Sequence, residues 1–280
     1  LIVSSGVNIG LDLLFILKLD FGVEGAAVAT VISQGIAALG CIIFAVKNND
    51  YFRLSKEHME ISWPIISKCV RIGIPVALQN SMIAISLIAL QRVANGFGEV
   101  AVAAFTATSR IEQLIQQPFN SLGAAIATFS GQNMGANKLD RVKRGYYKSI
   151  LIIGVFSGLA LLAAQFGGHA IMKMFVDKQP VIELGAKAIK ITSLLSFALG
   201  MIYITRGLLN GTGDSFYSMI NGIVEVVGRV GFSTGLALIP SVGVWSIWAT
   251  TGLTWVITAA ASVIRYMQGK WEKKSLVRQS

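Results

Sequence analysis

Long apolar runs separated by short polar segments make up most of the chain. A helix that crosses a membrane needs about 20 consecutive, mostly apolar residues. Runs that approach or exceed this length cover residues 1–17, 24–46, 73–95, 100–130, 147–167, 189–209, 216–239 and 244–267. The pattern predicts an all-α, polytopic membrane protein, a helical bundle of about eight transmembrane helices.

Composition supports a membrane protein and argues against a nucleic-acid partner. Hydrophobic residues make up 54% of the chain and charged residues only 14%, whereas soluble domains carry about 25% charged residues. The net charge is +10, but Lys and Arg gather at the ends of the apolar runs, as expected for cytoplasmic loops. We therefore expect the lipid bilayer, and no nucleic acid, as a partner.

The basic residues also predict an orientation. Most of the 24 Lys and Arg residues fall on one side of the predicted membrane, chiefly in segments 47–71, 138–148 and 265–278. This bias predicts a multi-pass cell membrane protein with a cytoplasmic C-terminus. The chain begins with Leu1 inside an apolar run, so we expect a fragment that starts within a membrane helix.

The longest hydrophilic break, 47–63, predicts a linker between two membrane blocks. After it, segment 65–72 is expected to lie along the interface before Gly73-Ile74-Pro75 turns the chain into the membrane. Segment 21–30 (FGVEGAAVAT) resembles 242–251 (VGVWSIWATT), which indicates an internal repeat. Parallel repeats are typical of transporters.

One predicted helix carries an unusual set of polar residues. Glu112, Gln116 and Asn120 are spaced i, i+4, i+8 and therefore share a face, and Arg110 lies on an adjacent stripe. Because ionisable groups are costly inside a membrane, they indicate a functional site by default. This face could line a water-filled cavity and bind a cation or a polar ligand group, and Glu112 could hold a proton. Alternatively, Arg110 and Glu112 are neutralised by polar neighbours and only hold the helix in place.

Neighbouring predicted helices offer further candidates. Asn80 and Gln91 share a face, with Gln79 beside Asn80, so these residues could complete the polar wall or bond neighbouring helices. Tyr203 is a candidate cavity residue, whereas Arg206 is expected to extend to the cytoplasmic surface.

Two further sets of charges interrupt the apolar runs. Glu225 precedes Arg229 by four residues, the favourable order for an intrahelical ion pair, and we interpret this pair as structural. Asp12 is an isolated carboxylate in the first run.

Enzyme and metal chemistry find little support. His58 and His169 lie in predicted loops on opposite sides, and Cys41 and Cys69 are expected to be free thiols, so a metal site is not expected. No GxxxxGK[ST] motif occurs, which argues against ATP as the direct energy source. We expect no catalytic residues, no cofactor and no enzyme.

Several motifs together resemble one family. They are Asn8–Phe15 (NIGLDLLF) followed by GVEGAAVATVISQ, Gly73-Ile74-Pro75, Asn95-Gly96-Phe97-Gly98, the turn motif with Gly131, Gln132, Asn133 and Gly135, and the turn motif with Gly211 and Asp214. In this order and spacing, the chain resembles the multidrug and toxic compound extrusion (MATE) transporters. Asn210 stands where the family more often has arginine.

The resemblance implies a fold and an activity. Members have two six-helix lobes and export cationic or amphipathic small molecules by alternating access, in exchange for Na⁺ or H⁺. The implied domains are the last two N-lobe helices (1–46), a cytoplasmic linker and interfacial helix (47–72), a six-helix C-lobe (73–268) and a basic cytoplasmic tail (269–280). The remaining N-lobe helices would be required partners, and the complete protein would be a monomer.

The resemblance leaves the coupling ion open. Asp12 resembles a functional aspartate of the family, but its partners would lie in the remaining N-lobe helices. Some Na⁺-coupled members carry carboxylates on helices seven and ten, where this chain has none. Two alternatives stay open: a lipid-linked oligosaccharide flippase of the same superfamily, and a membrane-embedded transferase. The transferase would need a carboxylate cluster at the membrane surface, and none is visible in the sequence.

Overall fold

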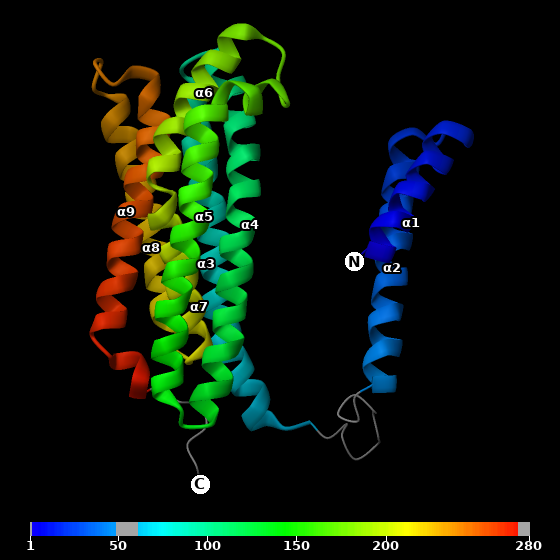
Figure 1. Cartoon of the computed structure of the whole chain (residues 1–280), viewed down its shortest axis with the longest axis vertical. Coiled ribbons are helices and arrows are strands. Elements are labelled where there is room, and N and C mark those ends of the chain that lie inside the picture. The colour runs from blue at the N-terminus through cyan, green and yellow to red at the C-terminus, as the bar shows by residue number, and fades with distance from the viewer. Residues whose placement is uncertain (1, 49–60, 274–280) are drawn as a thin grey trace. The chain divides into compact units, whose positions relative to one another are not determined.

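The computed structural model describes residues 2–48 and 61–273, and all regular secondary structure in these ranges is helical (Figure 1). Helices are expected where apolar runs cross a membrane, because lipid offers no partners to backbone N–H and C=O groups. The chain forms two compact units, Leu1–Trp63 and Pro64–Ser280. Within the linker region predicted at 47–72, residues 49–60 lie outside the described residues.

The first unit is a helical hairpin. Helix α1 (Ile2–Asp12) continues as a π-helical segment (Leu13–Lys18) and packs against α2 (Gly22–Asn48). A Cβ atom at Gly25 would lie 2.9 Å from the Cβ atom of Phe21, so this glycine permits the tight connection. The Ser4 hydroxyl donates a hydrogen bond of 3.0 Å to the carbonyl of Ser33 and ties the two helices together.

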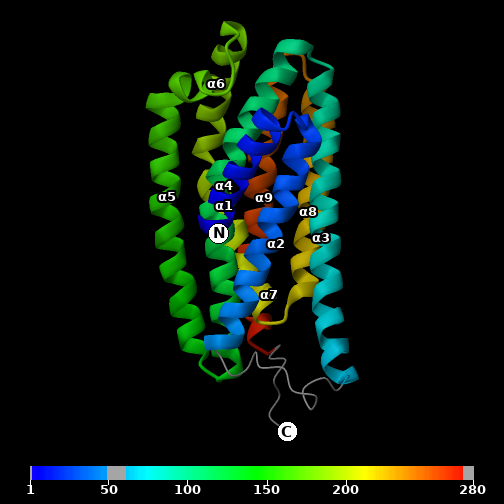
Figure 2. The same ribbon diagram turned by 90° about the vertical axis from the view of Figure 1, so that its right-hand side faces the viewer.

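The second unit is a bundle of long helices (Figures 1 and 2). Its helices are α3 (Trp63–Asn95), α4 (Glu99–Gly135), α5 (Leu139–Lys173), α6 (Gln179–Leu194), α7 (Ser196–Gly211), α8 (Ser215–Ala237) and α9 (Ser246–Met267). Short 3-10 segments precede and follow α9, at Gly243–Trp245 and Lys270–Lys273. Figure 2 shows α3 at one edge of this unit, beside α8.

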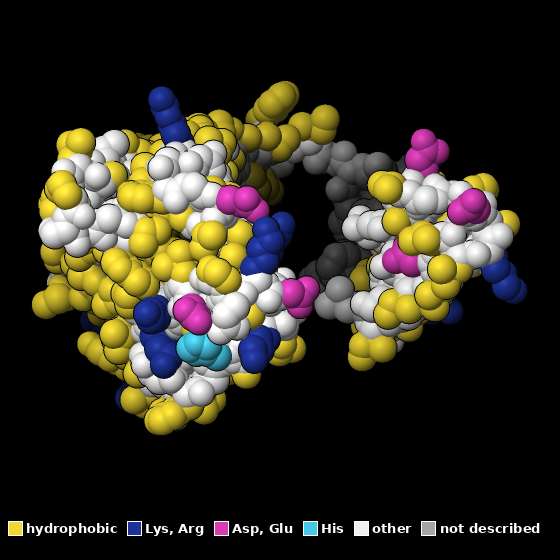
Figure 3. Space-filling model, turned by 90° about the horizontal axis from the view of Figure 1, so that it is seen from above, with side chains coloured by type: hydrophobic (Ala, Val, Ile, Leu, Met, Phe, Trp, Pro, Cys, Tyr) yellow, Lys and Arg dark blue, Asp and Glu magenta, His cyan; other side chains and the backbone are white. Residues whose placement is uncertain are grey.

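Length and hydropathy identify the membrane-crossing helices. Among the described residues, α2, α3, α5 and the segment Gly243–Met267 are long and apolar enough to cross a membrane. The bent pair α6–α7 would add a fifth span. Seen from the end where α6 lies, charged side chains are gathered on the tip of the second unit, among extensive hydrophobic surface (Figure 3). The all-α membrane fold predicted from the sequence is confirmed.

The break between α6 and α7 corrects the predicted span 189–209. Helix α6 ends at Leu194, α7 begins at Ser196, and the two are bent by 52°. The stretch LLSF contains neither Gly nor Pro, so the sequence carried no ordinary signal for this break.

Helix α3 also differs from the prediction. It runs without interruption from Trp63 through Gly73-Ile74-Pro75 to Asn95, so no turn separates an interfacial helix from a membrane helix. Segment 65–72 is the first part of the same helix.

The predicted cytoplasmic turn at Gly131–Ala136 lies mainly within a helix. Helix α4 continues to Gly135, and Gly131, Gln132 and Asn133 belong to its last turns. The chain reverses at Ala136–Lys138, where Asn137 adopts a left-handed conformation with φ 55°. Asparagine tolerates this conformation better than most residues.

Glycines permit close packing of α4 against α7. A Cβ atom at Gly123 would lie 2.8 Å from the carbonyl oxygen of Tyr203, and Cβ atoms at Gly207 and Gly211 would overlap the backbone of α4 at Gly123 and Ala127. Gly211, predicted as a turn residue, is therefore the last residue of α7 and a helix-packing glycine. We call this contact the α4–α7 seam.

The two halves of the predicted repeat share a backbone feature. Gly22 and Gly243 occupy matching positions in the two segments, and each has φ 53° at the start of a helical segment. Only glycine adopts this conformation readily. The shared geometry gives the short sequence match a structural basis.

Ion pairs and stacked rings fasten the end of α9 to the bundle. The carboxylate of Asp214, which is fully buried, lies 2.7 Å from Arg265 Nη2. The Tyr266 ring stacks on both Tyr146 and Trp271, with centroid distances of 4.2 and 5.5 Å. Asp214, predicted as a turn residue, therefore also anchors α9.

Candidate functional site

A polar cavity lies inside the second unit, between α3, α4, α7, α8 and α9. Its volume is about 110 Å³. Apolar residues, among them Ile83, Leu90 and Trp255, form much of its wall. The ionisable residues that line it are Glu112, Tyr203, Arg206, Glu225 and Arg229. Such a set inside an apolar bundle indicates a functional site.

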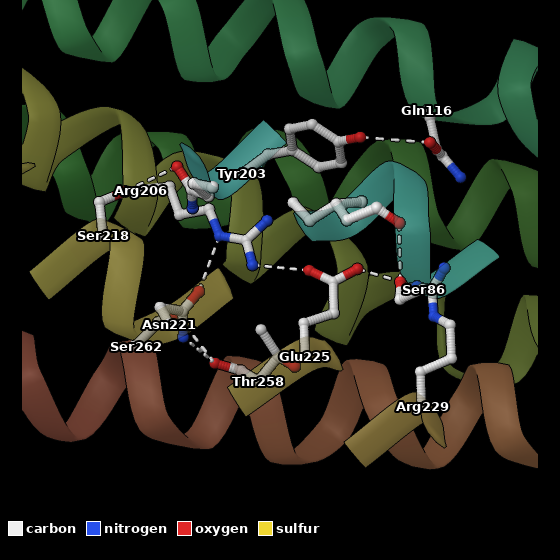
Figure 4. A network of polar contacts seen from close by, with 12 residues as sticks. Ser86, Gln116, Tyr203, Arg206, Ser218, Asn221, Glu225, Arg229, Thr258 and Ser262 are labelled. Carbon is white, nitrogen blue, oxygen red and sulfur yellow. Dashed lines mark hydrogen bonds and ion pairs between the residues drawn. The ribbon is translucent and has the colours of Figure 1, made fainter. Parts of the chain in front are cut away.

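Glu225 is the centre of the charged network (Figure 4). Its Oε2 atom lies 2.6 Å from Arg206 Nη2, and its Oε1 atom lies 2.8 Å from Arg229 Nη2. Arg206 Nε also donates to Asn221 Oδ1 at 2.7 Å, and the Asn221 amide donates to the carbonyl of Thr258 at 2.9 Å. The network therefore ties α7, α8 and α9 together.

Arg206 does not extend to the membrane surface, as the sequence had suggested. Its side chain is 13% exposed and pairs with Glu225 within the bundle. The pairing is physically reasonable, because a buried guanidinium is stabilised when a carboxylate and an amide accept its hydrogen bonds. Sequence reasoning missed this contact, although an arginine within an apolar run was itself a signal to look for a carboxylate partner.

Glu112 enters the cavity from α4. Its Oε1 atom is buried and makes no hydrogen bond of ordinary geometry within the described residues, and the nearby polar group is the hydroxyl of Thr192. The side chain also lines a smaller hollow at the α6–α7 break, together with Thr192 and Ser196. One helical turn further along α4, Gln116 Oε1 accepts a hydrogen bond of 3.2 Å from Tyr203 Oη.

A second compartment adjoins this cavity. It has a volume of about 340 Å³ and shares Ile83, Tyr203 and Arg206 with the first. Amide side chains dominate its polar lining, namely those of Gln79, Asn80, Asn120 and Asn210. Gln79 Oε1 accepts a hydrogen bond from Ser218 Oγ at 3.2 Å, whereas Gln79 Nε2 is buried without a partner among the described residues.

Three predicted site residues lie elsewhere. Arg110 is exposed and donates to Gln113 of the same helix at 3.4 Å. Gln91 donates to Asn95 at 3.0 Å and does not line either compartment. Asp12 belongs to the first unit, where its Oδ1 atom is buried without a partner among the described residues.

The described part of the chain offers few residues that could bind a metal ion. Residues 2–48 and 61–273 contain no cluster of three His, Cys, Asp or Glu that could hold a metal ion. Cys41 and Cys69 are exposed free thiols. His58 lies outside the described residues.

Comparison with known families identifies the chain. The MatE family model matches residues 75–234, more than half of the chain. The chain therefore belongs to the MatE family, as the sequence motifs had suggested.

Individual relatives are named for drug resistance and export. A probable multidrug resistance protein, YoeA of Bacillus subtilis (strain 168), is 23% identical over 99% of this chain and 62% of its own length. The multidrug export protein MepA of Staphylococcus aureus (strain MRSA252) is 26% identical over 94% of this chain and 56% of its own length. The first relative is thus named for drug resistance and the second for drug export.

Solved structures show the same fold. A crystal structure of MATE in the bent conformation superposes with a TM-score of 0.88 at 24% identity, over 99% of this chain and 62% of that protein. An outward-facing multidrug resistance MATE family transporter gives a TM-score of 0.89 at 23% identity, over 98% and 62%. The chain thus spans about three fifths of the length of the proteins it matches.

Proposed function

We propose that this chain is part of a secondary-active multidrug efflux antiporter. The protein would export cationic or amphipathic small molecules in exchange for Na⁺ or H⁺. One observation carries the proposal: a cavity with four charged side chains lies inside an apolar helical bundle of the MatE family. Charged side chains inside a membrane bundle are energetically costly, so they usually serve transport or binding.

Glu112 is the group we assign to cation or proton binding. Its buried carboxyl group lies on the cavity wall without an ion-pair partner of its own among the described residues, and the Thr192 hydroxyl is its polar neighbour. Glu225, in contrast, already contacts two guanidinium groups, so its carboxylate is less available to a ligand. Gln116 and Tyr203 lie beside the cavity as a hydrogen-bonded pair that can turn toward polar groups of a substrate.

The domain assignment completes the proposal. Residues 1–46 would be the last two helices of an N-lobe, 47–72 a cytoplasmic linker region, 73–268 the C-lobe and 269–280 a cytoplasmic tail. The two lobes of the full-length protein would alternate access to the cavity from either side of the cell membrane. The complete protein would work as a monomer, with its C-terminus in the cytoplasm.

Transport in proteoliposomes tests this function. The full-length protein would be reconstituted, and efflux of the fluorescent cation ethidium measured under separate Na⁺ and H⁺ gradients. We expect coupled efflux under one gradient and its loss in Glu112→Gln. The matched control is Gln113→Ala, because Gln113 is the exposed neighbour on the same helix. Unchanged coupling in Glu112→Gln would remove the role of Glu112, and absence of cation efflux under both gradients would favour a lipid-linked oligosaccharide flippase.

A further inference from the structure

We propose that a groove between α3 and α8 binds one anionic phospholipid, with an acyl chain in the groove and the phosphate on Arg92. The groove has a volume of about 580 Å³. It shares none of its described lining residues with the two polar compartments. The inference therefore does not rest on the proposed transport function.

The groove arises because α3 and α8, which lie side by side in Figure 2, touch at one level and separate at another. Near the middle of α3, a Cβ atom at Gly222 would lie 2.8 Å from Cγ of Gln79, and Ser218 Oγ donates to Gln79 Oε1 at 3.2 Å. Closer to the C-terminal ends of both helices, Ile88 and Val230 line the groove. This half of α3 therefore has free space on the side of α8.

The lining of the groove is mainly apolar. It consists of Ile85, Ile88, Ala89, Arg92 and Val93 on α3 and of Val230, Ser233 and Thr234 on α8. Ile85 and Ile88 are 62% and 69% exposed, so the groove is open to its surroundings. Water is a poor occupant of an apolar space, because it needs polar partners for its hydrogen bonds. Within a bilayer, the hydrocarbon of a lipid is the occupant at hand.

The size of the groove fits one acyl chain of one leaflet. At 1.5 Å per residue, the lining from Ile85 to Val93 extends about 12 Å along α3. One leaflet contributes half of a hydrocarbon layer of about 30 Å, or about 15 Å. The volume equals roughly twenty water-sized groups, which is enough for the methylene groups of a chain. A chain held there would supply packing contacts that α3 lacks on this side.

Arg92 marks the head-group end of the groove. It lies in the last turn of α3, which ends at Asn95, and its side chain is exposed. It makes no side-chain hydrogen bond or ion pair with another described residue. A guanidinium can hold a phosphate through two parallel N–H···O bonds. Arg92 is thus placed to bind the phosphate of a lipid whose chain lies along α3.

The charges at the groove favour a lipid with net negative charge. Among the described residues that line the groove there is no Asp or Glu. The ammonium group of a zwitterionic lipid would therefore meet the guanidinium of Arg92 and no lining carboxylate. A lipid such as phosphatidylglycerol brings the same phosphate without an ammonium group. The groove should therefore prefer phosphatidylglycerol to phosphatidylcholine.

Photo-cross-linking tests the inference on the wild-type, full-length protein in vesicles. The probes are phosphatidylglycerol, phosphatidylcholine and diacylglycerol with the same diazirine-bearing acyl chain, and mass spectrometry locates the cross-links. We expect phosphatidylglycerol to label Ile85, Ile88 and Val230 at least roughly tenfold more than the other two lipids, because a charge-assisted hydrogen bond is gained. The peptide around Leu151, an exposed leucine on α5, reports non-specific contact with lipid.

Two variants assign the binding to the two parts of the site. Arg92→Gln should lower labelling by phosphatidylglycerol to the level of phosphatidylcholine, because it removes the guanidinium. Ile88→Trp should lower labelling of the groove by all three lipids, because the larger side chain fills it. The matched controls are Arg144→Gln and Leu151→Trp on α5, which change exposed residues outside the groove.

The outcomes decide the inference without reference to transport, because labelling needs no ion gradient. Equal labelling of the groove by the three lipids would refute recognition of the phosphate by Arg92. Absence of cross-links in the groove, with normal labelling around Leu151, would show that another part of the full-length protein covers it and would refute the lipid site. The wild-type comparison needs no variant, so a variant that fails to fold does not prevent the test.

Discussion

Helix α4 has two very different boundaries within the second unit. Toward α7 it forms the α4–α7 seam, where Gly123, Gly207 and Gly211 bring the two backbones into contact. Toward α3 it is separated by the two polar compartments. The same helix thus combines a close backbone contact on one side with a ligand-sized space on the other.

Helix α3 touches the rest of the bundle at its middle and near its C-terminal end. Gln79 packs on Gly222 of α8, and Leu90 and Ala94 join a cluster with Phe105 and Trp248. Between these points its residues line the cavities. The α4–α7 seam is closely packed, whereas α3 makes few contacts. We infer that α4 and α7 hold Glu112 and Arg206 in fixed positions and that α3 is the helix that can move.

Substitution at the seam should have the largest effect on stability. A Cβ atom at Gly207 would overlap the backbone of Gly123, which cannot move aside as a side chain can. We expect Gly207→Val to destabilise the protein by about 3 kcal/mol or more and to lower the yield of folded protein. The control is Gly158→Val in α5, because a Cβ atom there meets nothing within 4 Å. Thermal unfolding in detergent measures both, and equal stabilities would contradict the close seam.

Removal of the central carboxylate should be nearly as damaging. Glu225→Gln leaves Arg206 and Arg229 buried without a counter-charge, which we expect to cost about 3–5 kcal/mol. Glu183→Gln is a suitable control, because Glu183 lies in an exposed contact with Gln179 on α6. Chemical unfolding followed by tryptophan fluorescence would measure the difference. Similar unfolding of the two variants would show that the network contributes little.

Leucine truncations compare the two sides directly. Leu208 in α7 is completely buried, so Leu208→Ala should lower stability by about 2–5 kcal/mol. Leu87 in α3 lines the cavity and is 48% exposed, so Leu87→Ala should cost less than about 1 kcal/mol. Thermal unfolding of the two variants under identical conditions compares their losses of stability. A larger loss for Leu87 would mean that α3 is packed as firmly as α7.

The smallest effect is expected at the exposed N-terminal ends of α4 and α6. Lys178 and Glu99 form an ion pair of 2.8 Å, but their side chains are 73% and 83% exposed. The hydrogen bond and the charge of Glu99 raise the pKa of Lys178. Any stabilisation would persist at neutral pH and would be lost only as the pH rises through this raised pKa. Thermal unfolding of Lys178→Met should match the wild type, since exposed pairs contribute little, and a clear loss of stability would contradict this.

The sequence predicted the helical fold and the family, and both are confirmed. Apolar runs and ordered motifs are local signals, so they can be read without a structure. The spacing of Glu225 and Arg229 is equally local, and the structure places the two side chains in contact. The polar spacing of Glu112 and Gln116 pointed to the helix face that meets the cavity.

Features that depend on two helices could not be read in the same way. The sequence predicts Arg206 at the membrane surface, because its partner Glu225 lies on another helix and the sequence does not show that the two meet. The motif predicts a turn at Gly211, because nothing in the motif shows that α4 passes close by. The sequence does not predict the α6–α7 break, because the residues there are apolar enough for an unbroken span.

The lengths of three helices have a consequence at the membrane surface. Helices α3, α4 and α5 contain 33, 37 and 35 residues, and at 1.5 Å per residue they extend about 50–55 Å. The hydrocarbon layer is only about 30 Å thick, so roughly 20–25 Å of each helix must stand in the headgroups or in water. These projecting helical turns are accessible from water and offer helical epitopes to antibodies. Their amide hydrogens should also exchange faster than those in the middle of the same helices. The residue at which the exchange rate changes would mark the edge of the bilayer on each helix.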